Sequence, residues 1–411
     1  MSETNWAGNV TYGAARLHRP ATLDELRRIV AAARRLRVLG ARHSFNAIAD
    51  SDDLVTLAGL PTDVRVERAA GTVTVAGAMT YGALATALRP AGLALHNMAS
   101  LPHISIAGAV ATATHGSGDT SGNLATAVTA LELLTSGGEL VTVERGDPDF
   151  DGLVVALGAA GVVTRLTLDV EPAYEVRQRV FEQLAWERLH EHFDAVTAAG
   201  DSVSVLTRFG ECVDAVWVKR RVTGAPEDVE PDLFGARAST ADRHLIAGLD
   251  PAATTPQLGR PGLWSDRLPH FRMGYTPSSG AELQSEYLVP RAHALPAIDA
   301  VRALGDRITP LVQGCEIRTI AADGLWMSPQ YGVDTVGLHF TWRPEPDAVA
   351  RVLAALEDAL APFSARPHWG KLFLGCAGPL YPRRDDFAAL IARYDPRGVF
   401  VNPWLSRYVF G

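Results

Sequence analysis

Apolar positions near the start of the chain repeat at the spacing of one helical face. The repeat occupies Leu26, Ile29, Val30 and Ala33. Thr22 and Glu25 stand before it as a capping box, in which each side chain accepts a hydrogen bond from the other residue's backbone. This pattern predicts a helix from residue 23 to about residue 37. A strand-like run should follow the helix and end at Gly40.

The next stretch, up to about residue 172, alternates short apolar runs with glycine-containing turns. Residues 72–75 alternate at period two, which is typical of a strand, and residues 81–88 have a helical pattern. Three further segments predict strands: residues 131–134, 140–143 and 162–170.

The character of the chain changes around residue 171, where a second region begins. Strand-like pieces follow at residues 203–207, 213–219, 281–288, 315–319 and 336–342. A helix is predicted at about residues 296–304. The polar, proline-containing stretch at residues 221–232 should form a surface loop.

The length of 411 residues is sufficient for two or more domains with sizeable cores. The composition predicts a folded chain without large disordered parts, because 47% of the residues are hydrophobic and the mean hydropathy is +0.05. We expect a first domain at residues 1–172 and a second at residues 173–365. The final segment, residues 366–411, should return to the first domain.

Composition excludes several classes of protein. The formal net charge of −8 argues against nucleic acid or an anionic membrane as the main partner. Cys212, Cys315 and Cys376 are too few and too scattered for a disulfide framework or a zinc site, so no metal is expected. Residues 1–15 lack a basic segment followed by an apolar run, and no apolar stretch reaches membrane-spanning length. These features predict a cytoplasmic protein.

Glycine-containing loops are the first candidates for a cofactor site. No GxGxxG motif follows a predicted strand, so a Rossmann nucleotide site is not supported. The glycines are dispersed instead: Gly40, Gly108, Gly116, Gly118, Gly122, Gly158 and Gly161. Small residues let backbone N–H groups approach a phosphate closely, although the same glycines would also serve simple tight turns. His43, in the loop after Gly40, is placed at a strand end, although a lone loop histidine is commonly just a surface residue.

Two predicted strands carry polar residues at alternate positions. Glu316 and Arg318 share one face, and His339 and Thr341 likewise share one face of their strand. A polyol needs such a polar surface, because each buried hydroxyl requires a hydrogen-bonding partner. Strand residues that face solvent would produce the same pattern, so the spacing alone leaves both readings open.

Lysine is rare in this chain. Of 38 basic residues, only Lys219 and Lys371 are lysines. Lys371 stands beside Trp369 and Gly370, and its ammonium group has a tunable pKa that suits hydrogen bonding to a reacting hydroxyl. A random surface lysine is the alternative interpretation.

Six blocks occur in the same order as in a known enzyme family. They are residues 40–46, 97–105, 114–118, 315–319, 339–342 and 368–371. Together they resemble the alditol oxidases, which are polyol-oxidising members of the vanillyl-alcohol-oxidase flavoprotein family. The ending, residues 394–402, is similar to that of the sugar-lactone oxidases and dehydrogenases. The resemblance implies an α+β fold with two domains: a PCMH-type (vanillyl-alcohol-oxidase-like) FAD-binding domain and an antiparallel-sheet substrate domain, or cap, that covers the flavin.

The resemblance also implies which residues bind FAD. The matching positions are Gly40, Ala41, Arg42, His43, Ser44, Phe45, Asn46, Ala99, Ser100, Ser105, Gly108, Thr112, His115, Gly116, Ser117, Gly118, Gly158, Gly161 and Val163. His43 matches the position where an imidazole nitrogen bonds covalently to the flavin, and a neutral imidazole is a competent nucleophile. Arg42 departs from the glycine that some relatives carry. If Arg42 reshapes the loop, the covalent bond is in doubt while FAD binding is not.

Substrate-binding positions are implied in the same way. They match Ser100, Glu316, Arg318, His339, Thr341 and Lys371. His339 and Lys371 are the candidates for the catalytic base, and the sequence does not decide between them. Ala99 matches a position where a small side chain gives oxygen access to the reduced flavin.

The implied activity is an oxidation. The terminal carbinol of an alditol such as xylitol or sorbitol would become the aldose, while O₂ is reduced to H₂O₂. The enzyme is expected to be a monomer. A sugar-1,4-lactone oxidase or dehydrogenase of the same fold is the first alternative. A catalytically idle sugar-binding flavoprotein is the second.

Overall fold

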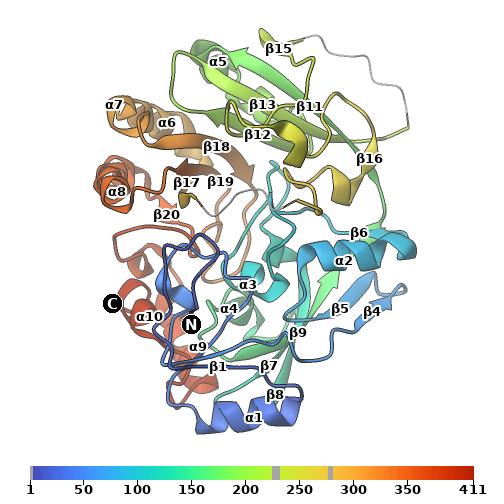
Figure 1. Ribbon diagram of the computed structural model, residues 1–411, viewed down its shortest axis with the longest axis vertical. Helices are drawn as coiled ribbons and strands as arrows, with labels where there is room; N and C mark the ends of the chain where they lie inside the picture. Colours follow the sequence, from blue (N-terminus) through green and yellow to red (C-terminus); the bar gives the residue numbers. More distant parts are fainter. Residues whose placement is uncertain (1–2, 225–231, 276–280) are drawn as a thin grey trace.

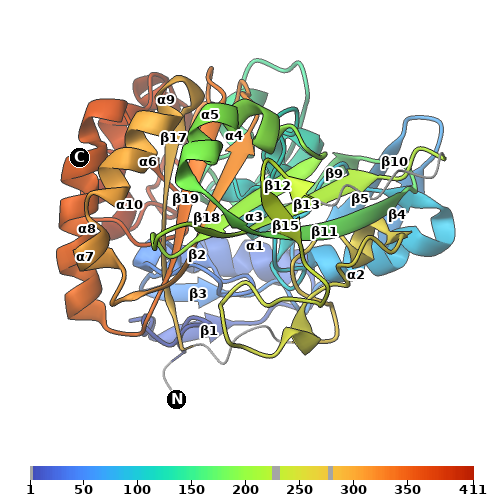
Figure 2. The ribbon, with the colours of Figure 1, turned by 90° about the horizontal axis from the view of Figure 1, so that it is seen from above.

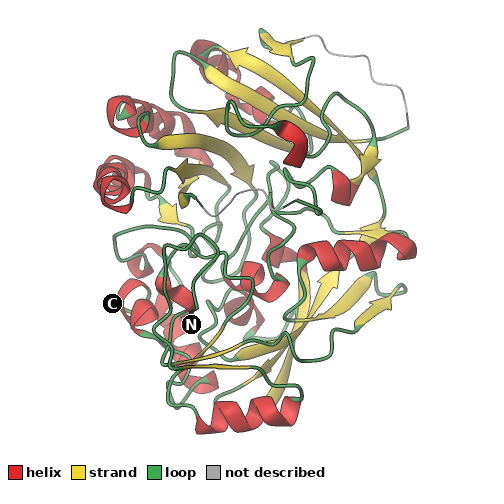
Figure 3. Ribbon diagram, viewed as in Figure 1, coloured by secondary structure: helices red, strands yellow, loops and turns green. Residues whose placement is uncertain are grey.

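The computed structural model describes residues 3–224, 232–275 and 281–411, and its strands fall into two groups (Figure 1). Loops fill the middle of the molecule between these groups, as the colouring by secondary structure shows (Figure 3). None of the helices in these ranges combines the length and apolar character that crossing a membrane requires. Most of the predicted loop at residues 221–232 lies outside the described residues.

The first group of strands comes from the N-terminal part of the chain. A three-stranded parallel sheet has the order β1 (Arg16–His18), β3 (Asp53–Val55) and β2 (Leu36–Val38). A five-stranded antiparallel sheet has the order β4 (Val64–Glu67), β5 (Thr72–Ala76), β9 (Val162–Asp169), β7 (Val128–Leu134) and β8 (Leu140–Glu144). The strands predicted at residues 72–75, 131–134, 140–143 and 162–170 are therefore confirmed. Helix α2 (Tyr81–Leu88) has the predicted bounds, and α3 (Ile106–Ala111) and α4 (Phe150–Val154) complete this part.

The first helix is shorter than predicted. Helix α1 (Leu23–Ala32) begins where expected, and the Thr22 side chain accepts a hydrogen bond from the Glu25 backbone. The prediction that the helix continues to residue 37 is wrong, because residues Leu36–Val38 form β2. Arg37 is buried there, and its guanidinium donates to the carbonyls of Leu157, Gly158 and Phe400. Partners so distant in sequence override the local helical pattern.

The second group of strands is one ten-stranded antiparallel sheet. Its order is β14 (Asp232–Leu233), β15 (Ala236–Ala238), β11 (Glu175–Leu184), β13 (Val213–Arg221), β12 (Ser202–Thr207), β18 (Val312–Ile320), β19 (Thr335–Trp342), β17 (Leu283–Pro290) and β20 (Arg366–Pro367), with β16 (Gly262–Leu263) paired to β11. Each strand predicted in this region is present. A short bridge of β6 (Leu93–Ala94) with β10 (Glu171–Pro172) marks the change between the two groups.

The two faces of this sheet differ in polarity. Ile317, Leu338 and Phe340 belong to the main hydrophobic core, together with residues of α5 (Trp186–Thr197), α6 (Ala294–Arg302) and α8 (Pro346–Leu360). Helices α6 and α8 lie side by side along one edge of the molecule (Figure 2). The intervening residues of β18 and β19 face the opposite way, toward the loops in the middle of the molecule. The predicted alternation of polar and apolar residues is thus present in the fold.

The C-terminal segment contains α9 (Arg384–Tyr394) and α10 (Pro403–Tyr408), and α10 packs against residues 47–49 of the N-terminal part (Figure 1). The Leu36 backbone donates to the Val399 carbonyl. The Asn402 side-chain amide lies within hydrogen-bonding distance of the carbonyls of Ala47, Ile48 and Asp50. Two segments at opposite ends of the sequence therefore form one unit.

Candidate active site

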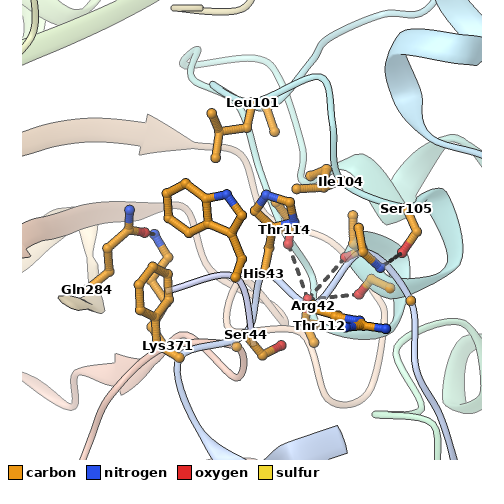
Figure 4. Close-up of a pocket in the computed structure, with 18 of the residues that line it drawn as sticks. Arg42, His43, Ser44, Leu101, Ile104, Ser105, Thr112, Thr114, Gln284 and Lys371 are labelled. Atoms are coloured by element: carbon orange, nitrogen blue, oxygen red, sulfur yellow. Dashed lines mark hydrogen bonds between the residues drawn. The ribbon is translucent and has the colours of Figure 1, made fainter. Parts of the chain in front are cut away.

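A large cavity lies between the N-terminal loops and the polar face of the ten-stranded sheet. Its volume is about 600 Å³, which is within the usual range for a cofactor or ligand site. The wall combines loops that are far apart in sequence with strands β17, β18 and β19. His43 occupies the middle of this wall, with Gln284 and Lys371 on one side and Ile104 and Ser105 on the other (Figure 4).

Most of the predicted FAD-binding residues line this cavity. They are Gly40, Ala41, Arg42, His43, Ser44, Phe45, Ala99, Ser100, Ser105, Gly108, Thr112, His115, Gly158, Gly161 and Val163. Close packing explains one glycine in particular: a Cβ atom on Gly40 would lie 2.5 Å from the Ser105 hydroxyl oxygen. Gly158 has a φ angle of +68°, which side-chain-bearing residues rarely adopt.

Four of the predicted FAD-binding residues lie behind the wall of the cavity. The Asn46 side chain donates to the carbonyls of Trp369 and Lys371, and so fixes the segment that carries the lysine. Ser117 donates to the Val203 carbonyl. Its neighbours Gly116 and Gly118 are also absent from the lining, and the Gly118 backbone donates to the Thr319 carbonyl. Ser117 and Gly118 therefore attach their loop to the ten-stranded sheet.

His43 has a buried nitrogen with no hydrogen-bond partner among the described residues. This atom is Nδ1, and the imidazole ring stacks on Trp6 with the ring centroids 5.3 Å apart. Burial lowers the pKa of His43 to about 4, although a hydrogen bond with the Ala41 backbone opposes this shift. The ring is therefore neutral at pH 7, with a lone pair available at the cavity wall.

Arg42 adopts a left-handed backbone conformation, with a φ angle of +65°. Glycine adopts this conformation at little cost, whereas an arginine needs further contacts to hold it there. Here the guanidinium forms an ion pair with Glu3, and the Arg42 carbonyl accepts a hydrogen bond from the Trp6 backbone. These contacts hold the loop in the shape that places His43 in the cavity.

The predicted substrate-binding residues all line the same cavity. They are Ser100, Glu316, Arg318, His339, Thr341 and Lys371. Register explains their proximity, because Glu316 pairs with His339 between β18 and β19. Arg318 donates to the Ser100 hydroxyl over 3.4 Å, which joins the sheet to the loop that carries Ala99.

A residue that was not predicted, Glu286 on β17, occupies the centre of this cluster. Its side chain is 1% exposed. Its carboxylate lies 3.0 Å from His115 Nε2, 3.1 Å from Arg318 Nη2 and 3.3 Å from Lys371 Nζ. Burial alone would raise its pKa, but the charges of Lys371, His115 and Arg318 outweigh that effect and hold the pKa well below its usual range. Glu286 is therefore an ionised carboxylate with three cationic or hydrogen-donating partners.

Gln284, two residues earlier on the same strand, fixes the hydrogen bonds of His339. The Gln284 amide nitrogen donates to Glu282, so the amide oxygen must act as an acceptor. That oxygen lies 3.1 Å from His339 Nε2 and 3.0 Å from Lys371 Nζ. Both groups therefore donate to it, and the lone pair of the neutral His339 ring lies on Nδ1.

His339 Nδ1 is buried and has no hydrogen-bond partner among the described residues. Burial, reinforced by the charge of Lys371, lowers the pKa of His339 to about 4. Burial also lowers the pKa of Lys371, and Glu286 opposes that shift. Like His43, His339 is therefore a neutral imidazole with an unused lone pair at the cavity wall.

Sequence reasoning missed Glu286 and Gln284, although the signal was present. Both residues alternate with Ser285 and Tyr287 along β17, in the same way as the polar residues of β18 and β19. The alternation indicates that Gln284 and Glu286 share one face of β17. Only the register of the sheet, which places Glu286 opposite His339, shows that this face belongs to the site.

The cavity fits the FAD that the sequence resemblance implies. Contact between Ser105 and both Gly40 and Gly108 leaves no space for larger residues at those two positions. The unpartnered Nδ1 of His43 supplies a nitrogen atom for a group inside the cavity. Small and apolar residues, including Ala99, Leu101 and Ala109, are suited to covering a planar ring system.

Two family profiles match the chain. The profile described as FAD binding domain matches residues 14–144. The profile described as D-arabinono-1,4-lactone oxidase matches residues 281–408.

Similar proteins include two enzymes that match almost the whole chain. An alditol oxidase of Streptomyces sp. is 50% identical, and the match covers 99% of both sequences. An L-gulono-1,4-lactone dehydrogenase of Mycobacterium tuberculosis is 30% identical, and the match covers 98% of both. The crystal structure of cholesterol oxidase from B. sterolicum has a TM-score of 0.81 and 16% identity, and the superposition covers 99% of this chain and 96% of that one. This structural likeness, together with the FAD binding domain profile, confirms the predicted fold class.

We predict that replacing Glu286 with glutamine destabilises the fold, because three donors would lose their anionic partner. Glu286→Gln should lower the free energy of unfolding by about 3 kcal/mol at pH 7. The pKa of Glu286 is depressed in the folded state, so its contribution is complete above the ordinary glutamate pKa of 4.5 and is lost as the pH falls below that value. Urea unfolding at neutral and acidic pH measures the difference.

The exposed residue Glu67 supplies the matched control. Glu67→Gln should leave the free energy of unfolding within about 0.5 kcal/mol of the wild-type value. The difference in free energy of unfolding between wild type and Glu286→Gln should shrink on acidification. A difference that stayed constant, or widened, would contradict the assignment of Glu286 as an ionised buried carboxylate.

Proposed function

Since the chain belongs to the alditol oxidase family of FAD-dependent oxidoreductases, we propose that it oxidises the terminal carbinol of an alditol to the aldose with O₂ as the electron acceptor. The observation that carries this proposal is one cavity whose wall combines the predicted FAD loops with a polar strand face. Xylitol and sorbitol are the proposed substrates, and H₂O₂ is the proposed second product.

FAD, when bound, supplies the redox chemistry by accepting a hydride from the carbinol carbon and passing two electrons to O₂. We propose that the loop at residues 40–45 and the small residues around Ser105 and Gly158 hold it. His43 is the proposed point of covalent attachment, since its neutral ring and unpartnered Nδ1 suit a nucleophile.

His339 is the proposed catalytic base. Its Nδ1 lone pair faces no hydrogen-bond donor among the described residues, while Gln284 holds the other ring nitrogen as a donor. The hydroxyl proton of the substrate passes to Nδ1 as the hydride leaves the same carbinol, so the alcohol loses two electrons and two hydrogens. This geometry favours His339 over Lys371, whose Nζ already donates to Gln284 and pairs with Glu286.

The remaining polar residues are proposed to bind hydroxyl groups. Glu316 accepts hydrogen bonds, whereas Arg318 and Lys371 donate them, so vicinal hydroxyls find partners of both kinds. Thr341 and Ser100 can do either. We propose that Ala99, which is small and lies in the cavity wall, leaves O₂ room beside the flavin.

We propose a domain division that follows the two groups of strands. Residues 1–172 form the FAD-binding domain and residues 173–365 form the cap. Residues 366–411 return to the first domain, which is supported by the backbone hydrogen bond between Leu36 and Val399.

Oxidation of a sugar-1,4-lactone is the second candidate function. The lactone oxidase profile over residues 281–408 favours it, since that range includes Glu286, Glu316, Arg318 and Lys371. The two substrates differ in shape rather than in reaction chemistry. An idle sugar-binding role is disfavoured, because the proposed base and both cationic side chains are present in the cavity.

A substrate panel tests the proposed function. Xylitol, sorbitol and L-gulono-1,4-lactone should be supplied in turn to the FAD-loaded protein under air, with H₂O₂ and O₂ measured together. We expect the two alditols to consume O₂ and to yield an equal amount of H₂O₂. Turnover of the lactone alone would reverse the order of the two candidate functions.

Substitutions test the base. We expect His339→Gln to lower kcat by about 10²–10⁴-fold while the flavin remains bound, because the acceptor for the hydroxyl proton is lost. The wild-type kcat should be independent of pH above neutrality and should fall as the pH approaches the His339 pKa of about 4, where the ring becomes protonated. Lys371→Met is the comparison: it should raise KM and keep this acidic limb. Near-normal kcat in His339→Gln would show that another group takes the proton.

A denaturing gel tests the covalent bond. The wild-type band should fluoresce under ultraviolet light, and the His43→Ala band should be dark even though that variant still binds FAD before denaturation. Release of free FAD from the denatured wild type would show that the cofactor is held by non-covalent contacts alone.

A further inference from the structure

Lys219, the second lysine of the chain, is buried in a place that the proposed reaction does not use. It lies on β13 and is 1% exposed. Its Nζ donates to the Leu268 carbonyl and lies 3.1 Å from Nδ1 of His270, where either atom can be the donor: the ammonium donates to a bare Nδ1, and a protonated Nδ1 donates to the amine. Both partners are uncharged groups, so they compensate only part of the cost of burying an ammonium ion.

His270 connects this lysine to the cavity described above. The ring is 4% exposed, and its Nε2 lies 3.2 Å from the Glu316 carboxylate. Trp217 packs edge-on against the ring, with the centroids 5.2 Å apart. Glu316 in turn lies 3.7 Å from His339 Nδ1, the atom proposed to take the substrate proton. Four titratable side chains thus follow one another from His339 to Lys219.

The outer end of this row reaches a second cavity. This cavity has a volume of about 490 Å³, and Lys219 lines it together with Asp169, Glu171, Asp201 and Arg221. Glu316, at the inner end, lines the first cavity, which Lys219 does not reach. The row therefore runs along the polar face of the sheet, between the cavity proposed to hold the substrate and a separate cavity with a charged wall.

We propose that Glu316, His270 and Lys219 form a proton path between the two cavities. The proposal rests on the proposed function, because the proton concerned is the one that His339 takes from the alditol hydroxyl. A bound alditol and cofactor would fill the first cavity, so a route along the face of the sheet lets this proton leave without passing the substrate.

Each transfer along the path conserves protons and charge. The proton taken at His339 Nδ1 passes to the Glu316 carboxylate, which gives it to Nε2 of His270. The opposite nitrogen, Nδ1, gives its own proton to the Lys219 amine, and the resulting ammonium releases a proton to water in the second cavity. Since the overall oxidation of an alcohol by O₂ releases no net proton, the same path returns a proton when O₂ is reduced.

Lys219 is suited to its end of the path. Burial lowers the pKa of Lys219 to about 7, with Glu316 opposing and Arg318 reinforcing the shift, so amine and ammonium are both populated near neutrality. Charged groups on the outer side are Asp169, Glu171, Asp201 and Arg221, with His96 beside them. These groups face the same cavity and provide acceptors for a departing proton.

Anaerobic stopped-flow mixing tests the path. The FAD-loaded protein is mixed with xylitol in weakly buffered solution that contains a pH indicator, and flavin bleaching and proton release are recorded together. In wild type the two signals should coincide. In Lys219→Met the flavin should bleach within about twofold of the wild-type rate, while proton release should lag by about tenfold or more. His270→Gln should show the same lag.

Ser204→Ala is the matched control. Ser204 contacts His270 Nε2 over 3.4 Å but lies outside the row. Flavin bleaching and proton release should therefore coincide in Ser204→Ala, as they do in wild type. Coincident signals in both Lys219→Met and His270→Gln, or no proton release from wild type, would overturn the path. A wild-type flavin that xylitol fails to bleach would instead refute the proposed function.

A second measurement follows the titration of Lys219 in the wild-type protein. The chain has only two lysines, so a protein labelled with ¹³C at lysine Cε gives two resonances, of which Lys219→Met identifies one. The Lys219 resonance should titrate near pH 7. A Lys219 resonance that did not titrate between about pH 5 and pH 9 would overturn the path, because the group could not exchange its proton during turnover.

Discussion

The active-site geometry depends on one buried negative charge, that of Glu286. A carboxylate removed from water requires partners, and here they come from three separate parts of the chain. His115 belongs to an N-terminal loop, Arg318 to β18 and Lys371 to the C-terminal segment. Each partner also lines the cavity. The requirement to satisfy one charge therefore sets the positions of the groups that meet the substrate.

The direction of the hydrogen bonds around Gln284 also fixes which nitrogen of His339 carries the proton. Glu282 fixes the orientation of the Gln284 amide, and that amide makes His339 a donor at Nε2. The lone pair of the neutral His339 ring therefore lies on Nδ1. An amide that carries no charge thus determines which nitrogen is basic, and Glu286 determines where the neighbouring ammonium lies.

Local patterns in the sequence predicted the strands and α2 well, because their periodicity reflects one buried face. The alternation at Glu316 and Arg318 likewise indicated a polar face, and the structure places both residues in the cavity wall. The end of α1 was wrong, since Arg37 is held in β2 by carbonyls from distant segments. Asn46 and residues 116–118 lie behind the wall for a similar reason: their partners become neighbours only in the folded chain. The three partners of Glu286 also become neighbours only in the folded chain.

The union of the two chain ends has a consequence for biosynthesis. Leu36 of β2 donates a hydrogen bond to the Val399 carbonyl, and Lys371 completes the cavity from the same terminal segment. During synthesis on the ribosome, the loop that carries His43 emerges early, but the wall of the cavity stays incomplete until nearly the whole chain has been made. Stable capture of the flavin must therefore follow translation rather than accompany it, and a nascent chain truncated before residue 371 would expose an unfinished pocket.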